Sequence, residues 1–211
     1  MKKLRSFEFI SVISVTVLVV AFLVLAGCTG QTDRGAVSEN SATNNEGGAT
    51  MKKTLVVYYS ATGSTQDVAK EIASRADADL FEVVPNPNYT ADDLNYNNPD
   101  SRVSKEHDDA SLRECLLEQT TPDNFENYDT VYIGYPIWWG IAAWPLDAFI
   151  KGNDFTGKTI IPFCTSSSSG LGESAKNLQA MNNTGTWLEG KRFQSGVSGV
   201  EIDEWIDSLQ L

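Results

Sequence analysis

The residues best suited to chemistry in this sequence form one short, hydroxyl-rich turn. It consists of Ser60, Ala61, Thr62, Gly63, Ser64 and Thr65. The turn follows a continuous apolar run, residues 55–59, and precedes a helix-forming stretch, residues 66–75. A turn between a buried strand and a helix start offers free backbone N–H groups, side-chain hydroxyls and the positive end of the helix dipole. These groups favour an anion, most naturally a phosphate.

Residues that are missing from this turn narrow the choice of anion. A loop that binds a nucleoside triphosphate needs a Lys after its second glycine, and no Lys follows Gly63. A dinucleotide site needs Gly-x-Gly-x-x-Gly, and the turn has one glycine. A phosphate monoester held by neutral hydroxyl and amide groups fits better. A capped turn that binds nothing is the alternative.

A second loop combines a proline with two adjacent tryptophans. It contains Pro136, Ile137, Trp138, Trp139 and Gly140. Pro136 is expected to end strand pairing, because proline has no N–H to donate. Two adjacent tryptophans just past a strand cannot both point into one core. At least one should therefore lie near solvent, unless a large planar ring system stacks on its indole.

A third loop is made almost entirely of small residues. It contains Thr165, Ser166, Ser167, Ser168 and Gly170. Small residues let the backbone approach a ligand closely, although a flexible turn has the same composition. The segment that begins at Cys164 resembles the Cys-x₅-Arg loop of tyrosine phosphatases. Gly170 stands where the arginine should be, so that chemistry is excluded.

The elements that must position these loops alternate along the chain. We predict strands at 54–59, 79–84, 130–135, 159–165 and 186–193, and helices at 65–76, 104–118, 144–150, 172–181 and 202–209. Alternation of this kind predicts an α/β fold, with a parallel sheet covered by helices on both faces. Five strands with a phosphate turn after the first favour the doubly wound order 2-1-3-4-5. Ligands then lie beyond the carboxyl ends of the strands, where the loops after Tyr59, Tyr135 and Thr165 meet.

Two of these motifs resemble the flavodoxin family. Residues 56–65, with Ala69 and Ile72 beyond them, resemble the flavodoxin signature, and residues 135–140 resemble the Tyr-Pro-Ile-Trp-Trp-Gly run of one flavodoxin-like subgroup. The resemblance covers about residues 52–211. It implies a flavodoxin-like fold with FMN as cofactor. Residues 60–65 would wrap its phosphate, and residues 136–140 and 165–170 would contact the flavin ring.

The resemblance leaves more than one function open. The first is an electron carrier that passes electrons between redox partner proteins. The second is an FMN-dependent reductase that takes electrons from NAD(P)H or a membrane donor and acts on quinones or other small electron acceptors. An interaction module that has lost the flavin is the third. No catalytic residue is expected, and a response-regulator receiver is disfavoured because Ser60 and Thr62 stand where clustered Asp residues are needed.

Residues 86–113 are unusual for a compact α/β domain. Proline and many asparagines break regular structure there, and long loops of this kind are often functional. Tyr96, Arg102 and His107 could lie over the flavin or guide a partner. An ordered surface excursion with no such role is the alternative, and an exposed histidine is the default for His107.

The N-terminal segment carries an export pattern. Positive residues precede an apolar run, residues 9–26, which ends in Leu25-Ala26-Gly27-Cys28. This tetrapeptide resembles a bacterial lipoprotein box, which implies a signal peptide at 1–27 and a lipid on Cys28. Residues 28–50 are expected to form a flexible tether, and residues 51–211 are expected to form the FMN-binding domain. The domain would stand outside the cytoplasmic membrane, anchored through Cys28; an uncleaved membrane anchor is the alternative.

Charge and cysteine usage exclude several classes of partner. The formal charge is −12, and the N-terminal segment contributes positive charge, so the rest is more acidic still. Such an acidic domain disfavours nucleic acid and anionic surfaces as partners and suits basic proteins or cationic substrates.

His107 is the only histidine and no metal-ligand spacing is present, so no metal is expected. Cys115, placed in a helix, and Cys164, placed in a strand, are expected to be unpaired and mostly buried.

Overall fold

A parallel sheet forms the centre of the computed structural model, which describes residues 53–211. The strand order is β2-β1-β3-β5-β6. The strands are β1 (Thr54–Tyr58), β2 (Asp79–Glu82), β3 (Thr130–Trp138), β5 (Thr159–Thr165) and β6 (Thr186–Trp187). In chain order of the parallel strands this is the doubly wound order 2-1-3-4-5, so the predicted flavodoxin-like topology is confirmed.

The last predicted strand is broken in two. β6 pairs with β5 at Ile160, and a separate strand, β7 (Lys191–Phe193), pairs with β5 from Phe163 onward. The break lies opposite Pro162 of β5, which has no N–H to donate to a continuous ladder. The prediction of one strand over 186–193 is therefore wrong at its centre.

Strand β3 also differs from the prediction, because it continues past Pro136. Pro136 pairs with Thr165 at the end of the ladder, where a missing N–H costs little. Its carbonyl oxygen still accepts a hydrogen bond from the Ala143 N–H at 3.1 Å. The strand then turns back as the antiparallel β4 (Ile141–Ala142), with Trp138 paired to Ile141.

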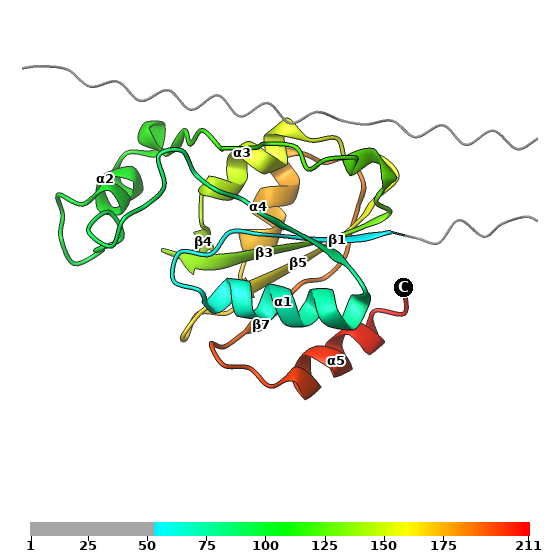
Figure 1. Ribbon diagram of the computed structural model, residues 1–211. Coiled ribbons are helices and arrows are strands. Elements are labelled where there is room, and N and C mark those ends of the chain that lie inside the picture. The colour runs from blue at the N-terminus through cyan, green and yellow to red at the C-terminus, as the bar shows by residue number, and fades with distance from the viewer. Residues whose placement is uncertain (1–52) are drawn as a thin grey trace, which may run out of the picture. The chain divides into compact units, whose positions relative to one another are not determined.

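Helices cover both faces of the sheet, as predicted. α1 (Ser64–Ala76) and α5 (Gly199–Ser208) lie on one face, and α3 (Pro145–Gly152) and α4 (Ser174–Met181) lie on the other (Figure 1). Each layer encloses its own hydrophobic cluster. One contains Val56, Ile72 and Trp205, and the other contains Val57, Tyr135 and Phe149.

The chain makes a long excursion between β2 and β3, here defined as residues 86–118. It projects at the carboxyl ends of the strands (Figure 1). The predicted helix over 104–118 is correct only as far as residue 108: the excursion contains α2 (Arg102–Asp108) and the short helix η1 (Ala110–Arg113). Another short helix, η2 (Phe125–Asn127), follows the excursion. Asp109 breaks the pattern, because its backbone is extended and its carboxylate accepts from the Ser111 N–H at 2.9 Å. Cys115 thus lies outside any helix, and it is buried and unpaired, as is Cys164 in β5.

The predicted signal peptide, residues 1–27, and the tether with Cys28, residues 28–50, lie outside the described residues. Among residues 53–211, no helix combines the length and the apolar composition needed to cross a membrane.

Candidate functional site

The three loops singled out from the sequence meet at the carboxyl end of the sheet. A cleft of about 410 Å³ lies between them, within the size range of small-molecule sites. It is lined by Thr62, Ser64, Leu94, Tyr96, Pro136, Ile137, Trp138, Thr165, Ser166, Ser167 and Ser195. The cleft therefore has hydroxyl groups on one side and apolar side chains on the other.

The first loop is shaped by Ser60 and Gly63. Gly63 has a φ of 92°, which favours glycine, and it occupies the N-cap of α1 without a capping side chain. The Ser60 Oγ accepts from the backbone N–H of Gly63 at 3.1 Å and of Gln66 at 3.2 Å. Ser60 thus ties the turn together, while Thr62 and Ser64 line the cleft.

The start of α1 keeps free donors. Gln66 gives its N–H to Ser60 Oγ, and Asp67 gives its N–H to the Gly63 carbonyl at 2.9 Å. Among the described residues, no partner accepts from the N–H of Ser64 or Thr65. Free N–H groups at the positive end of a helix dipole form a site for an anion.

A buried hydroxyl pair fixes the first loop to the third. Thr65 is 1% exposed, and its Oγ1 lies 2.8 Å from the Oγ1 of Thr165 at the end of β5. These two predicted site residues therefore hydrogen-bond to each other. Their pairing sets the spacing between the helix start and the serine loop.

Two residues that the sequence gave no reason to select complete this side of the cleft. Ser195, in the loop after β7, lines the cleft, and its Oγ lies 3.1 Å from the Ser64 Oγ. Arg192, in β7, donates to the Ser166 Oγ at 3.1 Å and to the Ser166 carbonyl oxygen at 2.8 Å. Arg192 thereby holds the serine loop. Arg192 and Ser195 reach the cleft because β7 is a separate strand from β6, and we did not predict this break from the sequence.

The tryptophan loop is a two-residue β-hairpin. Trp139 and Gly140 connect β3 to β4 with φ values of 45° and 82°. Positive φ at both positions is typical of a type I′ turn, in which Asn-Gly and Asp-Gly are preferred. A bulky side chain is a rare choice at the first position. As predicted, one tryptophan lies near solvent: Trp139 is 44% exposed.

Aromatic rings surround Trp138 on its inner side. Its ring makes edge contacts with Trp144 at 4.7 Å, and with Tyr59 and Tyr89 at 5.6 Å each, between ring centroids. Trp139 stacks on His107 at 4.3 Å and 9°. The tryptophan side of the cleft is therefore fixed by packing.

A buried carboxylate holds these rings in place. Glu106 is 5% exposed and accepts from the Arg102 Nε at 2.7 Å, the Trp144 Nε1 at 2.8 Å and the Tyr89 hydroxyl at 2.6 Å. The Arg102 guanidinium also lies 3.8 Å from the centroid of the Tyr89 ring. Burial, together with the Glu106 carboxylate, raises the pKa of Tyr89, so its hydroxyl stays a donor. We call Glu106, Arg102, Tyr89 and Trp144 the Glu106 network.

Several predicted site residues do not line the cleft. Ser60, Ala61 and Gly63 shape the first turn, Thr65 is buried behind it, Trp139 and Gly140 form the hairpin turn, and Ser168 and Gly170 are exposed in the serine loop. Leu94 and Tyr96 do line it, and they come from the excursion. We expected from the sequence that Tyr96 and Arg102 could lie over the ligand. Tyr96 lines the cleft, whereas Arg102 binds Glu106 in the Glu106 network.

The cleft can hold a molecule with a phosphate at one end and a flat ring system at the other. An anion without a bound metal ion could bind at the phosphate end. Its partners would be the hydroxyls of Thr62, Ser64 and Ser195 and the free N–H groups of Ser64 and Thr65. Among residues 53–211, no cluster of His, Cys, Asp or Glu could hold a metal ion. The Ile137 and Trp138 side suits a planar aromatic group.

One family model and several solved structures match this chain. Residues 53–209 match the model of the flavodoxin family. A candidate flavoprotein from Bacteroides eggerthii is 36% identical, with a TM-score of 0.69, over 75% of this chain and 98% of that one. Another from Bacteroides uniformis is 39% identical, with a TM-score of 0.68, over 74% and 98%. A flavoprotein in complex with FMN, from Lactobacillus acidophilus, is 21% identical, with a TM-score of 0.49, over 74% and 99%. No curated protein matches.

Proposed function

Because the chain belongs to the flavodoxin family, whose cofactor is FMN, we propose that it is an FMN-binding electron-transfer protein. One observation carries this proposal. Ser64, at the start of α1, lines the same cleft as Ile137 and Trp138 of the tryptophan loop, and the volume of this cleft is about 410 Å³. The phosphate of FMN would bind at Thr62, Ser64, Thr65 and Ser195, and its ring would lie toward Pro136–Trp138 and Thr165–Ser167.

The residues of this chain would bind and orient the cofactor. FMN, when bound, supplies the one- and two-electron chemistry. Ser60 and Gly63 shape the phosphate loop, the Thr65–Thr165 pair sets its distance from the serine loop, and Arg192 holds Ser166. Neutral hydroxyl and amide donors would carry most of the phosphate binding, because no Lys or Arg is among the described residues that line the cleft.

A visible spectrum tests this proposal. The full chain, purified and incubated with FMN, should retain a yellow cofactor in one-to-one ratio after gel filtration. A colourless protein would contradict it. Adding NADH or NADPH without oxygen separates the two redox functions. Slow or absent bleaching supports the carrier, and rapid bleaching supports the alternative, an FMN-dependent NAD(P)H or quinone reductase.

We further propose that the domain, residues 51–211, works outside the cytoplasmic membrane as a lipoprotein of the Tyr-Pro-Ile-Trp-Trp-Gly subgroup. Support comes from the sequence alone: a pattern typical of a signal peptide at 1–27, a lipoprotein-like box that ends at Cys28, and the polar composition of residues 28–50. Its partners would be redox proteins or small electron acceptors. Incorporation of labelled fatty acid into the wild type but not into Cys28→Ala, with fractionation of the membranes, tests this localisation.

A further inference from the structure

Three tryptophan rings connect the proposed FMN cleft to solvent. Trp138 lines the cleft, and its ring centroid lies 4.7 Å from that of Trp144. The Trp144 ring in turn lies 6.0 Å from that of Trp139, with an angle of 22° between the two planes. Trp144 is 1% exposed, whereas Trp139 is 44% exposed. The three rings therefore lead from the cleft through one buried ring to the surface, and we call them the tryptophan series.

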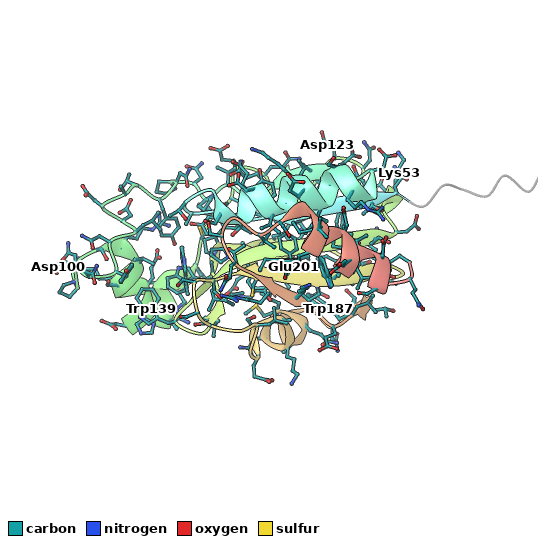
Figure 2. All side chains as sticks on the ribbon, turned by 90° about the horizontal axis from the view of Figure 1, so that it is seen from below. Lys53, Asp100, Asp123, Trp139, Trp187 and Glu201 are labelled. Atoms are coloured by element: carbon teal, nitrogen blue, oxygen red, sulfur yellow. The ribbon has the colours of Figure 1, made fainter. Side chains whose placement is uncertain are left out.

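The exposed end of the tryptophan series is fixed by packing. Trp139 stacks on His107 at 4.3 Å and 9° between the ring planes. Figure 2 shows Trp139 at the same end of the molecule as Asp100 of the excursion, far from Trp187 in β6. The exposed ring is thus held in place beside Trp144, while Trp187 is an indole remote from the series.

A series of indoles can do chemistry that packing alone does not require. Indole and phenol are the aromatic side chains that lose one electron most readily, whereas the benzene ring of phenylalanine resists this loss. Electron transfer between two rings slows steeply as their separation grows. The separations of 4.7 Å and 6.0 Å lie within the range of aromatic pairs in contact. A positive charge formed on Trp138 can therefore move in two short steps to Trp139.

Charged groups favour the movement of a positive charge toward Trp139. The Arg113 guanidinium lies 5.0 Å from the centroid of the Trp144 ring, so it repels a positive charge on that ring. The Glu106 carboxylate, which accepts from the Trp144 N–H at 2.8 Å, offsets part of this repulsion while the charge passes. Water stabilises the charge at the exposed Trp139, and so do residues 86–118, which contain eight Asp and Glu against three Lys and Arg.

The two tyrosines beside Trp138 are poorer exits. Tyr59 and Tyr89 each lie 5.6 Å from the Trp138 ring. A phenol that loses an electron must also lose its hydroxyl proton, and the buried Tyr59 hydroxyl has no partner among the described residues. The Tyr89 hydroxyl bonds to Glu106, which Arg102 also binds. Burial raises the pKa of both tyrosines, so neither releases its proton readily.

We propose that the tryptophan series moves an oxidising equivalent, the loss of one electron, from the FMN cleft to the protein surface. This inference rests on the proposed function, because the oxidant is a bound flavin excited by light. Trp138 loses one electron to the flavin, Trp144 gives one to Trp138, and Trp139 gives one to Trp144. A small enediol reductant in solvent then returns one electron to Trp139. The net change moves one electron and, through water, one proton from the reductant to the flavin, and all three indoles end as they began.

Laser-flash absorption of the FMN-loaded full chain tests this proposal. Gel filtration first removes unbound FMN, and indole radicals are then followed after excitation of the flavin, with increasing concentrations of ascorbate as the enediol. The wild type should form an indole radical whose lifetime shortens as ascorbate is added, because the charge has reached an exposed ring. An absent indole radical, or a lifetime that ascorbate does not change, would overturn the proposal.

The decisive variant is Trp139→Phe, which keeps an aromatic ring in the turn but removes the indole. The charge should then stay on the inner rings and return to the flavin, so the radical should be shorter-lived and insensitive to ascorbate. Trp187→Phe, at the remote indole, is the matched control and should behave as the wild type does. Unchanged ascorbate sensitivity in Trp139→Phe would overturn the proposal. So would a tyrosine radical that Tyr89→Phe abolishes, because it would place the charge in the Glu106 network.

Two further measurements separate this test from folding and from the proposed function. Circular dichroism checks the fold of each variant, and Trp139→Asn, which leaves the Asn-Gly pair that this turn prefers, should show the same loss of ascorbate sensitivity. A wild type that retains no FMN would overturn both the proposed function and this inference. A loaded wild type that forms no indole radical would overturn the inference alone.

Discussion

The two walls of the cleft are built in different ways. The phosphate wall, residues 60–65 with Thr165 and Ser195, uses neutral hydroxyl and backbone groups from short loops. The tryptophan wall, formed by the hairpin and the excursion, depends on a buried carboxylate and a guanidinium, Glu106 and Arg102. The first wall rests on separate pairs of neutral groups and should tolerate change, whereas the second shares one buried carboxylate and should fail as a unit.

The largest expected effect is at Glu106. Glu106→Ala leaves the Arg102 guanidinium, the Trp144 indole N–H and the Tyr89 hydroxyl without their shared acceptor. We expect the free energy of unfolding to fall by about 3–5 kcal/mol, the usual result of breaking a buried ion pair. Chemical denaturation measures this loss.

Two matched variants sharpen the Glu106 prediction. Glu106→Gln keeps an acceptor and should lose less stability than Glu106→Ala. Glu114→Ala, at an exposed carboxylate of the same excursion, should stay within about 0.5 kcal/mol of the wild type. Equal losses from Glu106→Ala and Glu114→Ala would mean that the network does not hold the tryptophan wall.

A smaller effect is expected at the buried hydroxyl pair of the phosphate wall. Thr65→Val leaves the Thr165 hydroxyl buried without a partner, which should cost about 1–3 kcal/mol of unfolding free energy. Replacing both threonines with valine removes both polar groups and should recover most of that loss. A double variant that loses the sum of the two single losses would contradict this pairing.

Much of the phosphate wall could be predicted from the sequence, and much of the tryptophan wall could not. Residues 60–65 follow their strand directly, so the local pattern locates the turn. The Glu106 network joins residues far apart in the chain, and no local pattern reveals that Glu106 is buried. The helix predicted over 104–118 ends early for a local reason, the cap at Asp109. Ser195 was not predicted as a site residue, because its position follows from the break between β6 and β7 opposite Pro162.

The hydroxyl of Ser195 should matter for the cofactor more than for the fold. Ser195→Ala removes a hydroxyl that lines the cleft beside Ser64, so FMN should bind about tenfold more weakly, a change of about 1.4 kcal/mol. Fluorescence titration of FMN measures the dissociation constant. Ser169→Ala, an exposed serine that does not line the cleft, is the control. Equal affinities for the two variants would remove Ser195 from the phosphate wall.

The smallest expected effect is a change in the pH dependence of stability, and it comes from the buried thiol of Cys164 in β5. Burial raises the pKa of its thiol to about 12, from the ordinary value of 9.0. The unfolded chain loses this proton first as the pH rises, so the contribution of Cys164 to stability is complete below pH 9.0 and declines toward pH 12. Denaturation between pH 8 and about 10.5 should therefore show a shallower decline for Cys164→Ala than for the wild type. Parallel curves would contradict the raised pKa.

Titration of the unloaded full chain with FMN and with riboflavin, which lacks the phosphate, tests the central claim most directly. If the free N–H groups of Ser64 and Thr65 hold the phosphate, two hydrogen bonds to a charged group, at about 1.5 kcal/mol each, should make FMN bind roughly 100-fold more tightly than riboflavin. Equal affinities, or no binding of either flavin, would contradict the account.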